Sequence, residues 1–202
     1  SRTMAEQFYD LEFGYRAEIS PRISFDLATF AGLYRRLETT ETQTARVLQQ
    51  PAGLMVIIPE TFFNNARAHT YGGEFSANWQ VTPRWRLLAG YSYLQVHVAH
   101  YFQIQGANPV HGAQLRSLLN VTPNLEFDNS LYYAENAPQG AGRTSRNVRW
   151  DTRLGWRVGE SLELSFTGQN LLRPQTLEFS DIYGLIATQV ERSIFGKITW
   201  RF

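Results

Sequence analysis

Apolar and polar side chains alternate along most of this 202-residue chain. From Tyr9 to Ile19, aromatic and aliphatic residues occupy every second position, and mostly charged residues stand between them. Successive side chains of a β-strand point to opposite faces of the sheet, so a period of two indicates strands with one apolar and one polar face. The pattern therefore predicts an all-β protein.

The alternation recurs and predicts nine strands. Their approximate limits are 9–19, 23–33, 71–81, 85–98, 113–121, 125–133, 148–158, 162–169 and 190–202. The fourth segment is the least regular, because Leu88, Leu94 and Val96 interrupt its faces. Tight turns occupy residues 20–22, 82–84, 122–124 and 159–161, and longer connections occupy about 37–60, 97–109, 135–146 and 173–188. Short and long connections alternate, as they do in antiparallel up-and-down barrels of the outer membrane.

Two environments can cover the apolar rows: the dry core of a soluble barrel or sandwich, or the hydrocarbon of a membrane around a transmembrane β-barrel. Strands of a dozen residues exceed the usual ~5–6 of soluble sheets and fit the ~9–11 that span a bilayer. Aromatic residues also gather near both strand ends, as interfacial girdles do. These are Trp79, Trp85, Trp156, Trp200 and Phe202 near the tight turns, and Tyr9, Tyr91, Tyr93, Tyr133 and Trp150 toward the long loops. We therefore favour the lipid environment.

An odd number of strands makes the first and the ninth run in the same direction, so closing the sheet would need a parallel seam. Bacterial single-chain barrels have even strand numbers. An open sheet in lipid would leave unpaired backbone groups that cost several kcal/mol each. We expect residues 1–202 to be the C-terminal portion of a larger barrel, with earlier strands outside this sequence.

Composition narrows the function further. The net charge of +1 gives no electrostatic footprint for nucleic acid, and the absence of cysteine excludes disulfides and thiol chemistry. The longest apolar run, residues 53–59, is too short for a membrane-spanning helix, and residues 1–7 do not resemble a signal peptide. No nucleophile–base pair or carboxylate dyad is evident, so we expect neither an enzyme nor a cofactor.

Four segments, in order, resemble the C-terminal half of TonB-dependent outer-membrane receptors of the siderophore-receptor type. The stretch 64–74 is similar to that family's Asn-x-Gly-x-Ala-x-x-x-Gly-x-Glu strand, although Ala66 stands where glycine is usual. Segment 85–94 resembles the following strand, 168–172 the Asn-Leu element of the penultimate strand, and 192–202 the terminal strand. The outward row Ile198, Trp200 and Phe202 resembles the signal by which the barrel-insertion machinery recognises its substrates.

The resemblance implies a bacterial outer-membrane location, a 22-stranded barrel and an N-terminal plug. It also implies active import of a ferric siderophore or a similar bulky nutrient, such as haem or cobalamin, energised through TonB, ExbB and ExbD. The alternatives are a passive porin or translocator barrel without TonB coupling, and a soluble ligand-binding β-barrel. The soluble barrel would bury Trp79, Trp156 and Trp200.

Candidate site residues fall into two groups. For contact with the ligand at the extracellular loops we propose Arg143, Arg146, Arg173, Tyr183, Tyr101 and Gln103. We expect Glu74, Arg149, Arg153 and Arg157 to face the lumen. Guanidinium groups bind carboxylate or catecholate groups, but pairing of the arginine row with Glu163, Asp151 or the plug is the stronger expectation. His97 and His100 could form a metal pair, yet no third ligand follows, and an interfacial role is favoured.

Overall fold

The computed structural model describes residues 4–51, 53–99, 110–135, 138–139, 142–143, 147–179 and 188–202. Every regular element in these ranges is a β-strand. The same ranges contain no helix of the length and apolarity needed to cross a membrane. The prediction of an all-β protein is confirmed.

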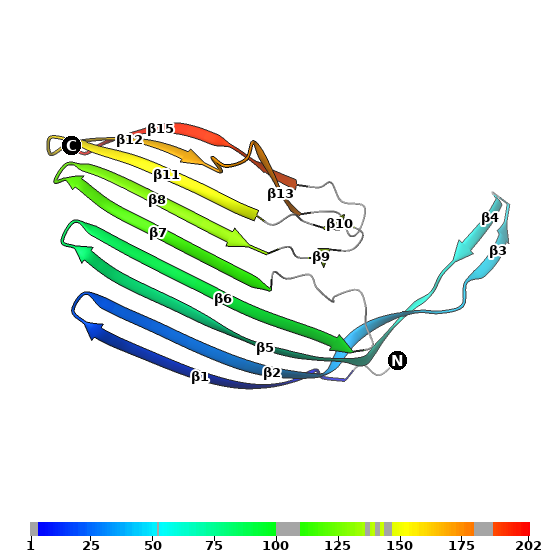
Figure 1. The fold of residues 1–202 in the computed structure, drawn as a ribbon. Coiled ribbons are helices and arrows are strands. Elements are labelled where there is room, and N and C mark those ends of the chain that lie inside the picture. Colours follow the sequence, from blue (N-terminus) through cyan, green and yellow to red (C-terminus); the bar gives the residue numbers. More distant parts are fainter. Residues whose placement is uncertain are drawn as a thin grey trace. The chain divides into compact units, whose positions relative to one another are not determined.

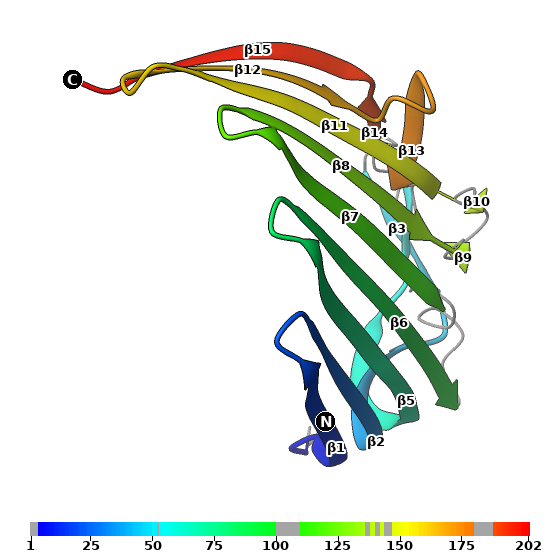
Figure 2. The same ribbon diagram turned by 60° about the vertical axis from the view of Figure 1, so that its left-hand side comes forward.

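Nine strands form one sheet (Figures 1 and 2). In spatial order they are β1 (Gln7–Ser20), β2 (Ile23–Thr42), β5 (Glu60–Thr82), β6 (Trp85–Ala99), β7 (His111–Thr122), β8 (Leu125–Ala134), β11 (Asn147–Val158), β12 (Leu162–Gln169) and β15 (Ser193–Trp200). The main strands follow one another in space as in sequence, and paired neighbours run antiparallel. The predicted up-and-down order of nine strands is confirmed, with β1 and β15 at the two edges.

Three long connections contain small hairpins of their own. They pair β3 (Arg46–Gln50) with β4 (Gly53–Ile57), β9 (Pro138–Gln139) with β10 (Gly142–Arg143), and β13 (Gln175–Phe179) with β14 (Thr188–Glu191). The connection predicted at about 37–60 is therefore largely strand, because β2 continues to Thr42 and β3 and β4 occupy much of the remainder. β5 begins at Glu60, well before the predicted start at 71. The predicted ninth strand divides at Arg192: its first residues pair with β13 and the remainder pairs with β12.

The described part of the chain has almost no apolar core. Its only buried hydrophobic residues are Ala66 and Ala68, while large apolar side chains remain exposed. Trp79, Trp156 and Trp200 are 47%, 51% and 74% exposed. The soluble β-barrel, which would bury these three indoles, is therefore contradicted.

The chain divides into two compact units. One comprises residues 1–11, 31–71 and 96–105, and the other comprises residues 12–30, 72–95 and 106–202. Within the second unit, β5 approaches β6 very closely at Gly72. A Cβ atom at Gly72 would fall on the backbone carbonyl oxygen of Tyr93, whereas one at Gly73 would lie 3.2 Å from the carbonyl oxygen of Ala28. Only glycine fits at position 72 without displacing a neighbouring strand.

Candidate functional site

One face of the sheet is apolar and exposed. A single row crosses five neighbouring strands, with each member directly opposite the next in the register: Trp85, Leu119, Phe127, Leu154 and Phe166. Phe127, Leu154 and Phe166 are 39%, 45% and 58% exposed. Burying a Leu or Phe side chain away from water is worth about 1.5–3 kcal/mol, so a row of this kind is stable only against an apolar surrounding.

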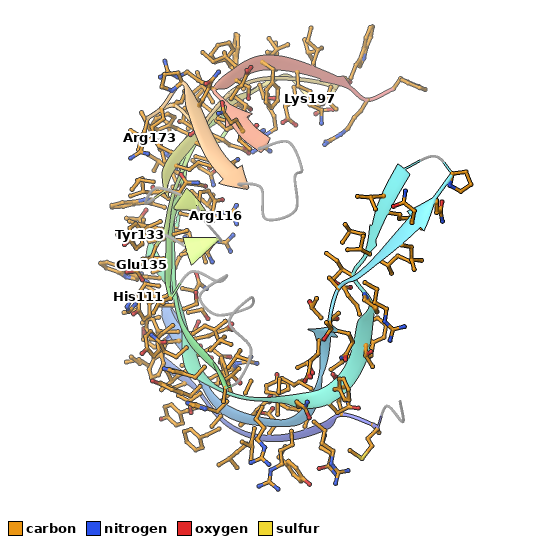
Figure 3. The ribbon with its side chains drawn as sticks, turned by 90° about the vertical axis from the view of Figure 1, so that its right-hand side faces the viewer. His111, Arg116, Tyr133, Glu135, Arg173 and Lys197 are labelled. Carbon is orange, nitrogen blue, oxygen red and sulfur yellow. The ribbon has the colours of Figure 1, made fainter. Side chains whose placement is uncertain are left out.

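Polar-tipped aromatic residues mark the loop end of this apolar face. Tyr91 Oη lies 2.6 Å from His111 Nδ1, and the rings of Tyr93 and His111 lie 5.1 Å apart. Figure 3 labels Tyr133 and His111 on one side of the ribbon and Arg116 on the other. Rings with a polar tip suit the boundary between hydrocarbon and water.

The opposite face, which we call the polar face, carries a charge network centred on Arg153. Its Nη1 donates to Glu126 Oε2 at 2.9 Å and to Asp128 Oδ2 at 3.4 Å, and its Nη2 donates to Glu163 Oε1 at 2.7 Å. Arg157 Nη2 donates to the second oxygen of Glu126 at 2.8 Å. One guanidinium thus joins carboxylates from β8 and β12, the two strands that flank β11.

A second cluster on the polar face lies nearer the loop end of β11. Arg149 forms a two-pronged ion pair with Asp151, with its Nε 2.9 Å from Oδ1 and its Nη2 2.6 Å from Oδ2. Asp151 Oδ1 also accepts the backbone N–H of Asn170 at 2.9 Å. The arginine row is therefore engaged by carboxylates of its own and neighbouring strands.

Asn170 directly follows β12 and is 1% exposed. Its φ of 53° is in the left-handed region, which asparagine tolerates better than most residues. Its Nδ2 donates to the carbonyl oxygen of Val190 at 3.0 Å, and the next backbone N–H, that of Leu171, donates to the carbonyl oxygen of Trp150. This residue therefore fastens the end of β12 to both neighbouring segments.

An open hollow of about 930 Å³ lies over the polar face within the second unit. Its polar lining includes Asp26, Glu74, Gln114, Asn147 and Arg149. The Arg149 guanidinium also lies over the ring of Tyr132, 5.8 Å from its centroid. Both charge signs and neutral hydrogen-bonding groups line the hollow, so it can hold a polar solute or a polar protein surface.

The structure describes few of the residues proposed for ligand contact. Arg173 lies half-buried between β12 and β13, within the second unit (Figure 3). Arg143 belongs to β10, but its side chain is outside the described part, as are Arg146, Tyr183, Tyr101 and Gln103 in full. Their role in ligand contact stays a prediction.

Among the histidines, the structure brings together a pair that the sequence did not suggest. His97 stacks on His69 of the neighbouring strand, with ring centroids 4.7 Å apart and planes at 4°. His100 lies outside the described residues. No group of three or more metal-ligating side chains occurs among the described residues.

The family model described as "TonB dependent receptor-like, beta-barrel" matches residues 8–171. The chain belongs to this family. The two-faced sheet is accordingly a segment of a TonB-dependent receptor barrel, located in the outer membrane of a Gram-negative bacterium, with its apolar face toward lipid. A search of curated proteins found no match.

Solved TonB-dependent receptor structures share this fold. The ferric-catecholate import receptor Fiu from Escherichia coli K12, in its closed form, superposes with a TM-score of 0.73 at 17% identity over 98% of this chain and 28% of its own. The pyoverdine outer-membrane receptor FpvA from Pseudomonas aeruginosa PAO1, bound to pyoverdine, gives 0.76 at 15% identity, over 98% and 30%. The copper transporter OprC gives 0.72 at 13% identity, over 100% and 32%. The chain thus spans under a third of these relatives' lengths.

The fold also explains three residues of the receptor motifs. Asn64 accepts the backbone N–H of Met4 at 2.7 Å and donates to the carbonyl oxygen of Arg36, which has a left-handed φ of 58°. Gly72 permits the close approach of β5 to β6, and Asn170 closes β12. Sequence reasoning missed Glu126 and Asp128 as partners of Arg153, although their alternation already placed them on the polar row.

Proposed function

We propose that this chain is part of an outer-membrane active transporter that imports a ferric siderophore or a similar bulky nutrient. Membership of the TonB-dependent receptor family over residues 8–171 carries the proposal. Two further observations support it: an exposed apolar face of the sheet, and a charged opposite face with an open polar hollow. Fiu is a ferric-catecholate import receptor, FpvA is a pyoverdine receptor and OprC is a copper transporter, so the fold leaves the transported complex open.

The nine strands are, in this proposal, adjacent strands of a larger barrel whose plug and earlier strands lie outside residues 1–202. The edge positions of β1 and β15 support it, because unpaired backbone groups in lipid cost several kcal/mol each. TonB, with ExbB and ExbD, would supply the energy for transport through the part of the protein outside residues 1–202. The row Ile198, Trp200 and Phe202 would serve the barrel-insertion machinery.

The test uses the full-length gene in its own host. A deletion strain is grown under iron limitation on a panel of single ferric siderophores, haem and cobalamin, with and without the complementing gene. We expect loss of growth on one source, rescue by the wild-type gene, and no rescue in a strain that lacks TonB. A passive porin or translocator would be indicated if rescue persisted without TonB.

Ligand contact by the loop residues has its own test in the same strain. Replacing Arg143, Arg146 and Arg173 together with glutamine should weaken binding of the identified ferric complex while the receptor still reaches the outer membrane. A matched triple change at arginines of the tight-turn rim, Arg22, Arg84 and Arg86, should leave binding unchanged. Equal loss in both triples would contradict the loop assignment.

A further inference from the structure

Asp151, on the polar face, holds a backbone amide as well as a guanidinium. Its Oδ1 accepts hydrogen bonds from Arg149 Nε and from the N–H of Asn170, each at 2.9 Å, and its Oδ2 accepts one from Arg149 Nη2 at 2.6 Å. The side chain of Asp151 is 17% exposed, so water has little access to these bonds. Asp151 therefore links β11 to the chain that leaves β12.

The segment that follows β12 is fixed at its start by three bonds. Besides the bond from its N–H to Asp151, Asn170 donates through Nδ2 to the carbonyl oxygen of Val190 in β14 at 3.0 Å. The N–H of Leu171 donates to the carbonyl oxygen of Trp150 at 2.9 Å. Two partners thus belong to β11 and one to β14, and the chain enters the following loop in a set direction.

The same segment is also fixed at its far end. The carbonyl oxygen of Pro174 accepts the N–H of Arg192, which follows β14, at 2.9 Å. Only Leu172 and Arg173 lie between these two sets of bonds. A proline has a fixed φ and restricts the residue before it to extended conformations. The backbone of Arg173, which precedes Pro174, is therefore already ordered by the fold.

Arg173 is one of the arginines proposed above to contact the nutrient. It is half-buried at the long-loop end of the sheet, between β12 and β13 (Figure 3). A binding group whose backbone is ordered beforehand does not pay the ordering entropy when the ligand arrives. Ordering the backbone of one residue lowers affinity by about fivefold to thirtyfold. Fixing the segment that carries Arg173 therefore strengthens binding by about that factor.

The pairing of Asp151 with Arg149 suits this arrangement electrostatically. An unpaired carboxylate in this part of the polar face would repel the anionic group that a guanidinium is meant to bind. The two-pronged pair with Arg149 neutralises Asp151, and it holds the carboxylate plane so that Oδ1 faces the N–H of Asn170.

We propose that Asp151 is a positioning residue for Arg173. Through Asn170, it fixes the segment from which Arg173 contacts a carboxylate or catecholate group of the transported complex. The inference rests on the proposed function, and it adds a residue of the barrel wall to the contacts proposed at the loops. Asp151 itself does not touch the complex, so the loss of its carboxylate weakens binding only where Arg173 is present.

The experiment uses the full-length receptor in the outer membrane of the deletion strain. The probe is the compound that restores growth in the panel above, in radiolabelled form, and binding to chilled cells is normalised to the amount of receptor in the outer membrane. We expect Asp151→Asn to raise the dissociation constant about fivefold to thirtyfold, and Arg173→Gln to raise it at least as much. In the Arg173→Gln background, Asp151→Asn should have no further effect. The control Glu163→Gln, which loses a 2.7 Å bond to Arg153 on the same face, should bind as wild type.

The double-variant comparison separates positioning from a merely structural role. An equal loss of affinity in both backgrounds, or wild-type affinity of the Asp151→Asn variant, would overturn the proposal. Unchanged binding by Arg173→Gln, or a loss in Glu163→Gln as large as that in Asp151→Asn, would overturn it as well. If no compound of the panel supports growth that depends on TonB, the proposed function itself is overturned.

Hydrogen exchange on the purified wild-type receptor tests the proposal without any variant. The amides of Asn170, Leu171 and Arg192 should exchange slowly before the compound is added, and hardly more slowly afterwards, because the segment is ordered in advance. Fast exchange that becomes slow only when the compound binds would show that the segment is ordered by the ligand, and would overturn the proposal.

Discussion

Arg153 supports the polar face through three carboxylates, and its removal gives a measurable prediction. The Arg153→Met variant keeps an unbranched apolar stem but removes the guanidinium, which leaves Glu126, Asp128 and Glu163 without their shared cation. Two of the lost hydrogen bonds are short, at 2.9 and 2.7 Å, and the third contact is 3.4 Å. The side chain of Arg153 and those of its three carboxylate partners are 28–30% exposed.

The expected cost follows from these contacts. A hydrogen bond to a charged group contributes about 1.5–3 kcal/mol, whereas an exposed ion pair contributes about 0.2–1 kcal/mol. Two short bonds at partial exposure fall between these limits, so we expect Arg153→Met to lower the free energy of unfolding by about 2–3 kcal/mol. The matched variant Arg157→Met loses one 2.8 Å bond from a side chain that is 49% exposed, and should cost about 0.5 kcal/mol.

The assay is urea unfolding of the full-length receptor refolded in micelles, followed by tryptophan fluorescence. A double-mutant cycle with Glu163→Gln isolates the pair between β11 and β12, for which we expect a coupling energy of about 1 kcal/mol. The reasoning is refuted if Arg153→Met costs no more than Arg157→Met. A coupling below about 0.3 kcal/mol would equally show that Arg153 and Glu163 act independently.

Three further predictions concern the backbone, the strand end and the lipid face, and share this unfolding assay. Gly72→Ala should destabilise the receptor by more than 1 kcal/mol, which is about the cost of an overpacked site, and clearly more than Gly73→Ala. Equal effects of the two variants would contradict the explanation that β5 approaches β6 closely at Gly72. Asn170→Ala should lower the free energy of unfolding by about 2–3 kcal/mol, because it loses a hydrogen bond and puts alanine in the left-handed region. Asn170→Gly should lose only the hydrogen bond, at a cost of about 1 kcal/mol. A larger cost for the glycine variant would contradict this explanation. Leu154→Lys should lower the free energy of unfolding by about 2–4 kcal/mol, whereas Val158→Lys, near the tight turn, should lower it by about 0–1 kcal/mol. A Leu154→Lys variant as stable as wild type would argue against lipid contact at this position.

The strands were predictable because their signal is local. Alternation in the printed sequence marked β7, β8, β11 and β12 to within about two residues, since each residue's face depends only on its position along its own strand. The same signal placed Glu126 and Asp128 on one row. It failed between residues 37 and 60, because the regular period is broken beyond the left-handed Arg36 of β2.

The sequence alone determined the two faces of this sheet, the alternation of tight turns and long loops, and the family resemblance. The tertiary structure decided which residues meet across strands, such as Arg153 with three carboxylates and His97 with His69. The physical reason is that cross-strand neighbours depend on register, and register is set by turns and bulges, such as the shift between Asn120 and Thr122. A displacement of one residue there changes every cross-strand partner farther along the strand. The alternation of apolar and polar residues in the sequence does not reveal such a displacement.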